Sequence, residues 1–190
     1  MKIKIITMLS AFVAFSSFGQ GTVSFQNANL STQRIQTNAV AIGGGTGSMT
    51  TAANSFQFQL FYGPNASSLT NASPIYFNST SFAGIIAGDA NFATVYPGNT
   101  SIFAQAFGWS AGVTLANAPT TVGAFYGFTP IINPTTATSP APATPLFGAS
   151  DTLTQFRGFT MSVVVPEPST MVLAGLGAAS LLLFRRRKQA

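Results

Sequence analysis

The feature that most limits how this chain can fold is a strict alternation of apolar and polar side chains near its middle. Phe56, Phe58 and Leu60 alternate with Gln57 and Gln59. Because successive side chains of a β-strand point to opposite faces, a period of two places the three large apolar groups on one face. The segment is therefore predicted to be a strand with one face in a hydrophobic core.

Other segments between residues 20 and 165 show strand patterns as well. Ile102 to Phe107 is bulky on both faces, which suits a strand inside a packing of two sheets. Thr154 to Val165 is rich in Phe, Thr and Val and is predicted to be another long strand. Shorter predicted strands are Thr22 to Gln26, Pro74 to Phe77, Asn91 to Tyr96 and Thr121 to Tyr126. Turn signals separate the strands at Gly43-Gly44-Gly45, Gly63-Pro64-Asn65, Gly88-Asp89, Pro97-Gly98-Asn99 and Ala118-Pro119.

These patterns predict an all-β fold for residues 20–165, with a single β-sandwich or jelly-roll-like ectodomain. No stretch in that range shows a capped apolar stripe with the helical period. Residues 131–145 contain four prolines among Thr, Ala and Ser, and they are predicted to be an extended, solvated loop. A flexible stalk or an O-glycan acceptor is the functional alternative for that segment.

The positive charge of the chain is confined to its two ends. The formal net charge is +5, yet between residues 20 and 165 the ionic side chains are Arg34, Asp89, Asp151 and Arg157, which sum to zero. Binding to nucleic acid needs several Lys or Arg on one surface. The sequence therefore predicts no nucleic-acid partner.

The side chains that carry most enzyme chemistry are scarce. The chain has no His and no Cys, so it lacks the usual base of a serine triad and the usual zinc ligands. Asp89 and Asp151 could form a glycosidase pair only if their carboxyls lay about 5–10 Å apart, and nothing in the sequence brings them together. Either could contribute to a calcium site only with several further oxygen ligands. We expect no catalytic residue, no metal, no cofactor and no enzyme activity.

The first 19 residues are predicted to be a secretory signal peptide. Lys2 and Lys4 precede an apolar stretch from Ile5 to Phe18, and the small residues Ser17 and Gly19 stand at its end. This is the order that signal peptidase recognises, with cleavage between Gly19 and Gln20. The alternative is a buried N-terminal helix.

A second apolar segment lies near the C-terminus, from Met171 to Phe184. As a helix it would rise about 21 Å, somewhat short of a hydrocarbon core of about 30 Å, and snorkelling side chains extend its reach. The basic cluster Arg185, Arg186, Arg187 and Lys188 follows at once. Such a cluster stays on the cytoplasmic side, so the segment is predicted to be a membrane stop with residues 20–165 outside.

Pro166, Glu167 and Pro168 stand just before that segment. The order of Pro-Glu-Pro, an apolar helix with small residues and a basic end resembles the PEP-CTERM sorting signal over residues 166–190. The resemblance implies an exported protein whose signal is recognised by exosortase, with cleavage near Pro-Glu-Pro and delivery to the cell surface or extracellular matrix. Segments of the middle region, such as Gln20 to Phe25 and Tyr96 to Thr100, resemble PEP-CTERM proteins with β-rich ectodomains.

Two other kinds of C-terminal segment remain open. One is a plain single-pass anchor that is never cleaved. The other is a GPI-type signal, but such a signal ends in its hydrophobic tail, which the terminal basic cluster contradicts.

The aromatic residues leave two hypotheses for the ectodomain. Trp109 and Tyr96 could be exposed rings that stack on sugars, or they could complete a Phe-rich core, which is the interpretation we favour. The first hypothesis is therefore a structural protein of the cell surface or matrix, associated with exopolysaccharide and biofilm. The alternative is a carbohydrate-binding surface module.

Overall fold

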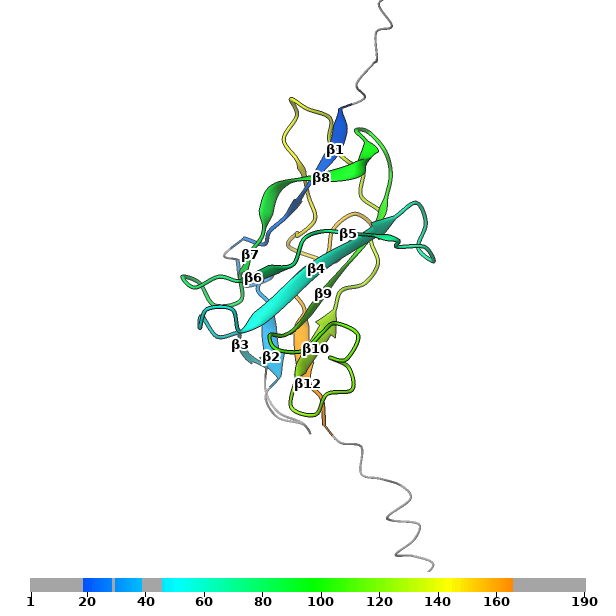
Figure 1. The fold of residues 1–190 in the computed structure, drawn as a ribbon. Coiled ribbons are helices and arrows are strands. Elements are labelled where there is room, and N and C mark those ends of the chain that lie inside the picture. Colours follow the sequence, from blue (N-terminus) through cyan, green and yellow to red (C-terminus); the bar gives the residue numbers. More distant parts are fainter. Residues whose placement is uncertain (1–18, 29, 39–45, 166–190) are drawn as a thin grey trace, which may run out of the picture.

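The structure is a computed structural model, and it describes residues 19–28, 30–38 and 46–165. Within these ranges the chain forms strands and loops and contains no helix, which confirms the all-β prediction for that part of the chain. No helix long and apolar enough to cross a membrane is found there. The strands form two sheets of unequal size (Figure 1).

The smaller sheet has three strands. Its central strand is β1 (Gln20–Phe25), which pairs antiparallel with β8 (Asp89–Pro97) and parallel with β11 (Thr144–Pro145). Val23 and Phe25 of β1 and Phe92 of β8 are buried. This sheet therefore supplies one wall of the core.

The larger sheet is built around two eight-residue strands, β4 (Phe56–Gly63) and β9 (Phe103–Ser110). They pair antiparallel along their full length. On the β9 side follow β10 (Phe125–Phe128), β12 (Thr160–Val163), β2 (Gln36–Asn38) and β3 (Thr46–Ser48), and on the β4 side lie β5 (Asn71–Ala72), β6 (Tyr76–Asn78) and β7 (Ile86–Ala87).

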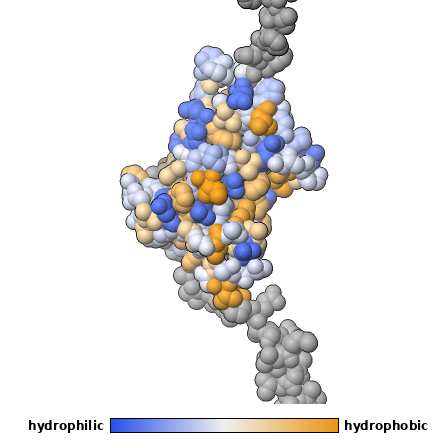
Figure 2. Space-filling model, viewed as in Figure 1, coloured by the Kyte–Doolittle hydropathy of each residue, from blue (hydrophilic) through white to orange (hydrophobic). Residues whose placement is uncertain are grey.

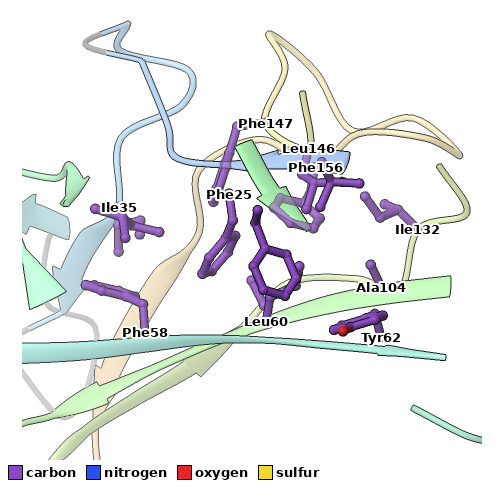
Figure 3. Close-up of a cluster of buried hydrophobic side chains, with 14 of the residues drawn as sticks. Phe25, Ile35, Phe58, Leu60, Tyr62, Ala104, Ile132, Leu146, Phe147 and Phe156 are labelled. Carbon is purple, nitrogen blue, oxygen red and sulfur yellow. The ribbon is translucent and has the colours of Figure 1, made fainter. Parts of the chain in front are cut away.

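The inward faces of β4 and β9 complement each other in size. Strand β4 points Phe58 and Leu60 into the core, whereas β9 places Ala104 and Ala106 there. The small side chains leave room for the large ones, as close packing requires. Figure 3 shows the labelled rings and aliphatic groups of the buried cluster meeting between the sheets: Phe25, Ile35, Phe58, Leu60, Tyr62, Ala104, Ile132, Leu146, Phe147 and Phe156.

Buried polar side chains complete hydrogen bonds that the strands leave open. The Asn27 side chain accepts from the Ile86 backbone N–H at 2.7 Å and donates to the carbonyls of Gln33 and Gly84. Asn78 accepts from the Phe56 backbone N–H at 3.0 Å. Since an unpaired buried backbone group is costly, these amides stabilise the ends of strands where a neighbouring strand stops.

Two strand predictions need correction in extent. The predicted strand from Thr154 to Val165 forms only at β12, since residues 154–159 follow an irregular path with an isolated bridge between Phe147 and Phe156. The strand predicted to start at Thr121 starts at Phe125. Residues just before it belong to a turn, with a hydrogen bond from the Ala124 N–H to the Thr121 carbonyl.

The prediction of a solvated loop at residues 131–145 agrees with the exposed residues 139–142 but is wrong near the start of the segment. Ile132, Pro134 and Thr136 are buried. Ile132 exchanges two backbone hydrogen bonds with Ala104, and the Pro134 carbonyl accepts from the Ile102 N–H. Proline lacks a donor but keeps its acceptor, so the segment can pair with β9 despite its composition.

Candidate functional site

The last described residues show how the folded domain leads into the predicted sorting signal. After β12, Val164 donates its N–H to the Ala124 carbonyl and accepts from the Gly123 N–H, both at 2.8 Å. Val165 follows with an exposed fraction of 44%. Pro166, Glu167, Pro168, the apolar segment and the basic stop at 185–188 lie outside the described residues. The described part of the domain therefore reaches the residue directly before the Pro-Glu-Pro motif.

The predicted signal-peptide junction lies at the other end of the domain. Gly19 and Gln20 are described, whereas residues 1–18 are not. Gln20 is exposed at the start of β1, and the Gly19 carbonyl accepts from the Gly98 N–H at 3.1 Å. Strand β1 begins near one end of the domain and β12 ends near the opposite end (Figure 1).

The two ectodomain carboxylates each accept a hydrogen bond from a backbone N–H nearby in the sequence, Asp89 at the start of β8 and Asp151 in the loop before β12. Asp89 accepts from the Asn91 N–H at 2.8 Å, and Asp151 accepts from the Arg157 N–H at 3.0 Å. In the part of the chain that the structure describes, no three residues of the types His, Cys, Asp and Glu lie together as a metal site would require. These contacts give both Asp residues a structural role.

Trp109 is not an exposed ring. It is 1% exposed, and its indole Nε1 donates to the Val113 carbonyl at 3.1 Å. Trp109 pairs with Gln57 and lies on the outward face of the large sheet, where the loop after β9 reaches its indole at Val113. A ring without accessible surface cannot stack on a ligand, so the use of Trp109 as a stacking residue is wrong.

Tyr96 lies in the other sheet and is not brought together with Trp109. Its half-buried ring packs edge-on against Tyr62, with ring centroids 6.1 Å apart. Its hydroxyl accepts from the Asn71 side-chain amide at 3.2 Å. These contacts give Tyr96 a packing role at the edge of the core.

The rings that do reach the surface lie on the outward face of the large sheet. We define the outer aromatic face as Phe61, Phe107, Tyr126 and Phe128. Phe107 lies at its centre, with ring centroids 5.4 Å from Phe61, 6.5 Å from Tyr126 and 5.8 Å from Phe128. Phe128 is 54% exposed, and the other three rings are partly exposed.

Partial burial affects the one titratable group of this face, because desolvation raises the pKa of the Tyr126 hydroxyl above its ordinary value. Tyr126 therefore presents a neutral hydroxyl to any ligand at ordinary pH. The group can both donate and accept a hydrogen bond in that state.

A shallow hollow lies on the same face. It has a volume of about 290 Å³ and is lined by Phe61, Leu69, Gln105, Phe107 and Leu115. The Gln105 side chain donates to the Thr129 carbonyl at 2.8 Å, which fixes the orientation of its amide. Figure 2 shows apolar side chains gathered at the surface along the middle of the view, over β4 and β9.

The sequence interpretation placed the candidate stacking rings at Trp109 and Tyr96, and it therefore missed this face. A usable signal was present. The outward positions of β9 include Phe103, Gln105 and Phe107, so bulk on both faces of that strand indicated a second apolar surface outside the core.

The family model of the PEP-CTERM protein-sorting motif matches residues 164–188. The chain is thus a PEP-CTERM sorting domain-containing protein, which implies export, passage through the membrane and processing by exosortase. No curated protein and no solved structure matches the chain.

Proposed function

We propose that this protein is a structural component of the outer cell surface or extracellular matrix, associated with exopolysaccharide and biofilm. The observation that carries the proposal is the sorting motif at residues 164–188, whose first residue, Val164, is still hydrogen-bonded to Gly123 and Ala124 of the β-rich domain. A signal in that position presents the whole domain outside the membrane once the chain is exported.

The route follows from the two predicted signals. Signal peptidase cleaves between Gly19 and Gln20, and exosortase then acts near Pro166, Glu167 and Pro168. Until that step the apolar segment holds the protein in the inner membrane. After cleavage the β-rich domain is either released from the membrane or conjugated to another molecule, and in both cases it remains at the cell surface.

The domain works without catalysis in this proposal. Asp89 and Asp151 each accept a hydrogen bond from a nearby backbone N–H, and the chain has no His or Cys to serve as base, nucleophile or soft metal ligand. A domain of this kind acts by presenting a folded surface. Loss of any detected turnover on Asp89→Asn or Asp151→Asn would overturn this part of the proposal.

The deciding experiment is the intact mass of the protein recovered from envelope and matrix fractions of its native cells. We expect a mass that starts at Gln20 and ends near Pro166 to Pro168, with or without an adduct. A Glu167→Ala variant should accumulate in the membrane fraction at a greater mass, whereas Asp151→Asn serves as a matched acidic control and should be processed normally. Mature protein that extends through Ala190 would make the chain an ordinary anchored protein.

One observation favours a second function, that of a carbohydrate-binding surface module. Four rings form a cluster on the outward face of a rigid sheet, beside a fixed Gln amide. Rings on a strand are positioned more precisely than rings on a loop. This function is compatible with a structural role in a polysaccharide matrix.

A further inference from the structure

We propose that the outer aromatic face binds a chain of neutral sugars, with Phe107 and Phe128 as the stacking rings. This proposal names the partner of the proposed surface function. It rests on that function, because a domain at the cell surface or in the matrix is exposed to glycans. The site consists of the hollow between Leu69 and Leu115 and the rim formed by Tyr126 and Phe128.

The shape of the site suits a sugar ring. A sugar presents a flat apolar face of C–H groups and an edge of hydroxyls, so its receptor combines aromatic faces with neutral polar groups. Phe107 and Phe128 are tilted by 38° to each other at a centroid distance of 5.8 Å, giving two adjoining apolar surfaces. The Gln105 amide and the neutral Tyr126 hydroxyl supply groups that bind hydroxyls.

The site is fixed before a ligand arrives. Phe61 and Phe107 project from β4 and β9, which are paired along their full length, and the Gln105 amide is held by the Thr129 carbonyl. A receptor that is already ordered loses little conformational entropy when it binds. The fold thus provides the preorganisation that weak stacking contacts need.

The charge of the face selects a neutral ligand. Strands β4, β9 and β10 contain no Asp, Glu, Lys or Arg. An anionic or cationic ligand would lose hydration there without gaining an opposite charge. The face therefore complements neutral glycans and disfavours uronic-acid polymers.

The size of the hollow argues for a narrow ligand over a second protein. Five residues line it, and its volume is near the lower limit of ligand pockets, which begin at about 300 Å³. A stable protein interface engages about 20–30 residues a side. A single polysaccharide strand fits this scale.

Binding can be measured with the full-length chain kept in a zwitterionic detergent, since a detergent with a sugar headgroup would compete. The probes are cellulose, chitin and mannan as neutral glycans and alginate as an anionic one, assayed by co-sedimentation or affinity electrophoresis. We expect at least one neutral glycan to bind, and Phe107→Ala and Phe128→Ala to weaken that binding about tenfold or more, which corresponds to about 1.4 kcal/mol.

Phe82→Ala is the matched control, because Phe82 is 53% exposed and lies outside the outer aromatic face. It should bind like the parent chain. Since Phe128 is mostly exposed, Phe128→Ala keeps the test valid even if Phe107→Ala unfolds, and circular dichroism checks the fold of each variant.

Three outcomes would overturn the proposal: binding to alginate alone, equal binding by Phe128→Ala and the parent chain, or no binding to any neutral probe. Concentration-dependent self-association that Phe128→Ala abolishes, without glycan binding, would instead make the face an interface between copies. If the protein binds no glycan, the mass of the processed protein is still as the sorting proposal expects. If the protein is not processed, the purified chain can still bind glycan. The two proposals are thus tested separately.

Discussion

Trp109 illustrates how a residue's side of the sheet and its burial are decided by different parts of the chain. The alternation along β9 places Trp109 on the same face as Phe107 and Gln105. Its burial does not follow from that alternation, and the contact seen on this face comes from the loop after β9, whose Val113 carbonyl accepts from the indole N–H. A period of two in the sequence shows on which face of the sheet a side chain lies, but it does not show which loop covers that face.

The first prediction at this scale is that Trp109 contributes to stability rather than to ligand contact. Trp109→Ala should lower the free energy of unfolding by about 3–5 kcal/mol, because it removes a large buried side chain and leaves a cavity. Urea unfolding followed by circular dichroism measures the change. Phe82→Ala should shift the same quantity by less than about 0.5 kcal/mol. A Trp109→Ala protein as stable as the parent would contradict the buried position.

A second prediction at the residue scale concerns alkaline pH. Burial raises the pKa of Tyr62, Tyr76 and Tyr126 above the ordinary value of 10.0, and for Tyr76 the negative charge of Asp89 adds to the effect. The unfolded chain therefore ionises these hydroxyls at a lower pH than the folded one. Their contribution to stability is complete below about pH 10 and is lost as the pH rises toward the folded-state values.

Urea unfolding at about pH 8 and about pH 11 tests this sign, because the lower value lies below the ordinary tyrosine pKa and the higher one above it. The free energy of unfolding should fall between them. The Tyr76→Phe variant should show a smaller fall, since phenylalanine has no proton to lose. A stability that is flat or rises over this range would contradict the raised pKa values.

At the scale of the strands, side-chain periodicity predicted much of the fold correctly, whereas chain composition gave wrong predictions for two segments. The alternation at Phe56 to Leu60 correctly predicted β4, because that strand has one buried face and a period of two reveals it. The proline-rich segment at 131–145 was misjudged, since composition does not show that Ile132 pairs with Ala104. The strand predicted from Thr154 to Val165 was too long for a similar reason. Residues that favour strands continue through the segment, but its first part has no neighbouring strand with which to pair.

The complementary sizes on β4 and β9 give a prediction at this scale. Ala106 is fully buried opposite Leu60, so Ala106→Val would add two methyl groups to a filled space. Overpacking of this kind costs about 1–3 kcal/mol in the free energy of unfolding. Thermal or urea unfolding would measure it.

The matched control for that change is Ala93→Val, which makes the same substitution at an exposed position of β8. Valine favours strands, so this control should be neutral or slightly stabilising. If both variants lost stability equally, the loss would reflect the substitution itself and not the packing between β4 and β9.

For the whole molecule, the sorting signal could be predicted from sequence because its parts are contiguous, and the motif match at residues 164–188 supports it. The outer aromatic face could not, since Phe61, Phe107 and Phe128 belong to three strands whose pairing decides that they meet. Contiguous signals depend on local order, whereas a surface site depends on the register between distant strands.

The last prediction follows from the charge of the whole ectodomain, whose ionic side chains Arg34, Asp89, Asp151 and Arg157 sum to zero. At the proposed matrix location, hydrogen bonds and apolar contacts, not ion pairs, should then hold the mature protein. Raising NaCl from about 0.1 M to about 1 M shortens the screening length from about 10 Å to about 3 Å, which weakens exposed ionic contacts. The fraction of protein released from matrix preparations should stay constant over this range, while urea, which weakens apolar and peptide contacts, should release it.

A basic protein retained by the same matrix provides the positive control for salt release. Progressive release of this protein by NaCl would mean that ionic contacts retain it, and a neutral surface would no longer explain its location.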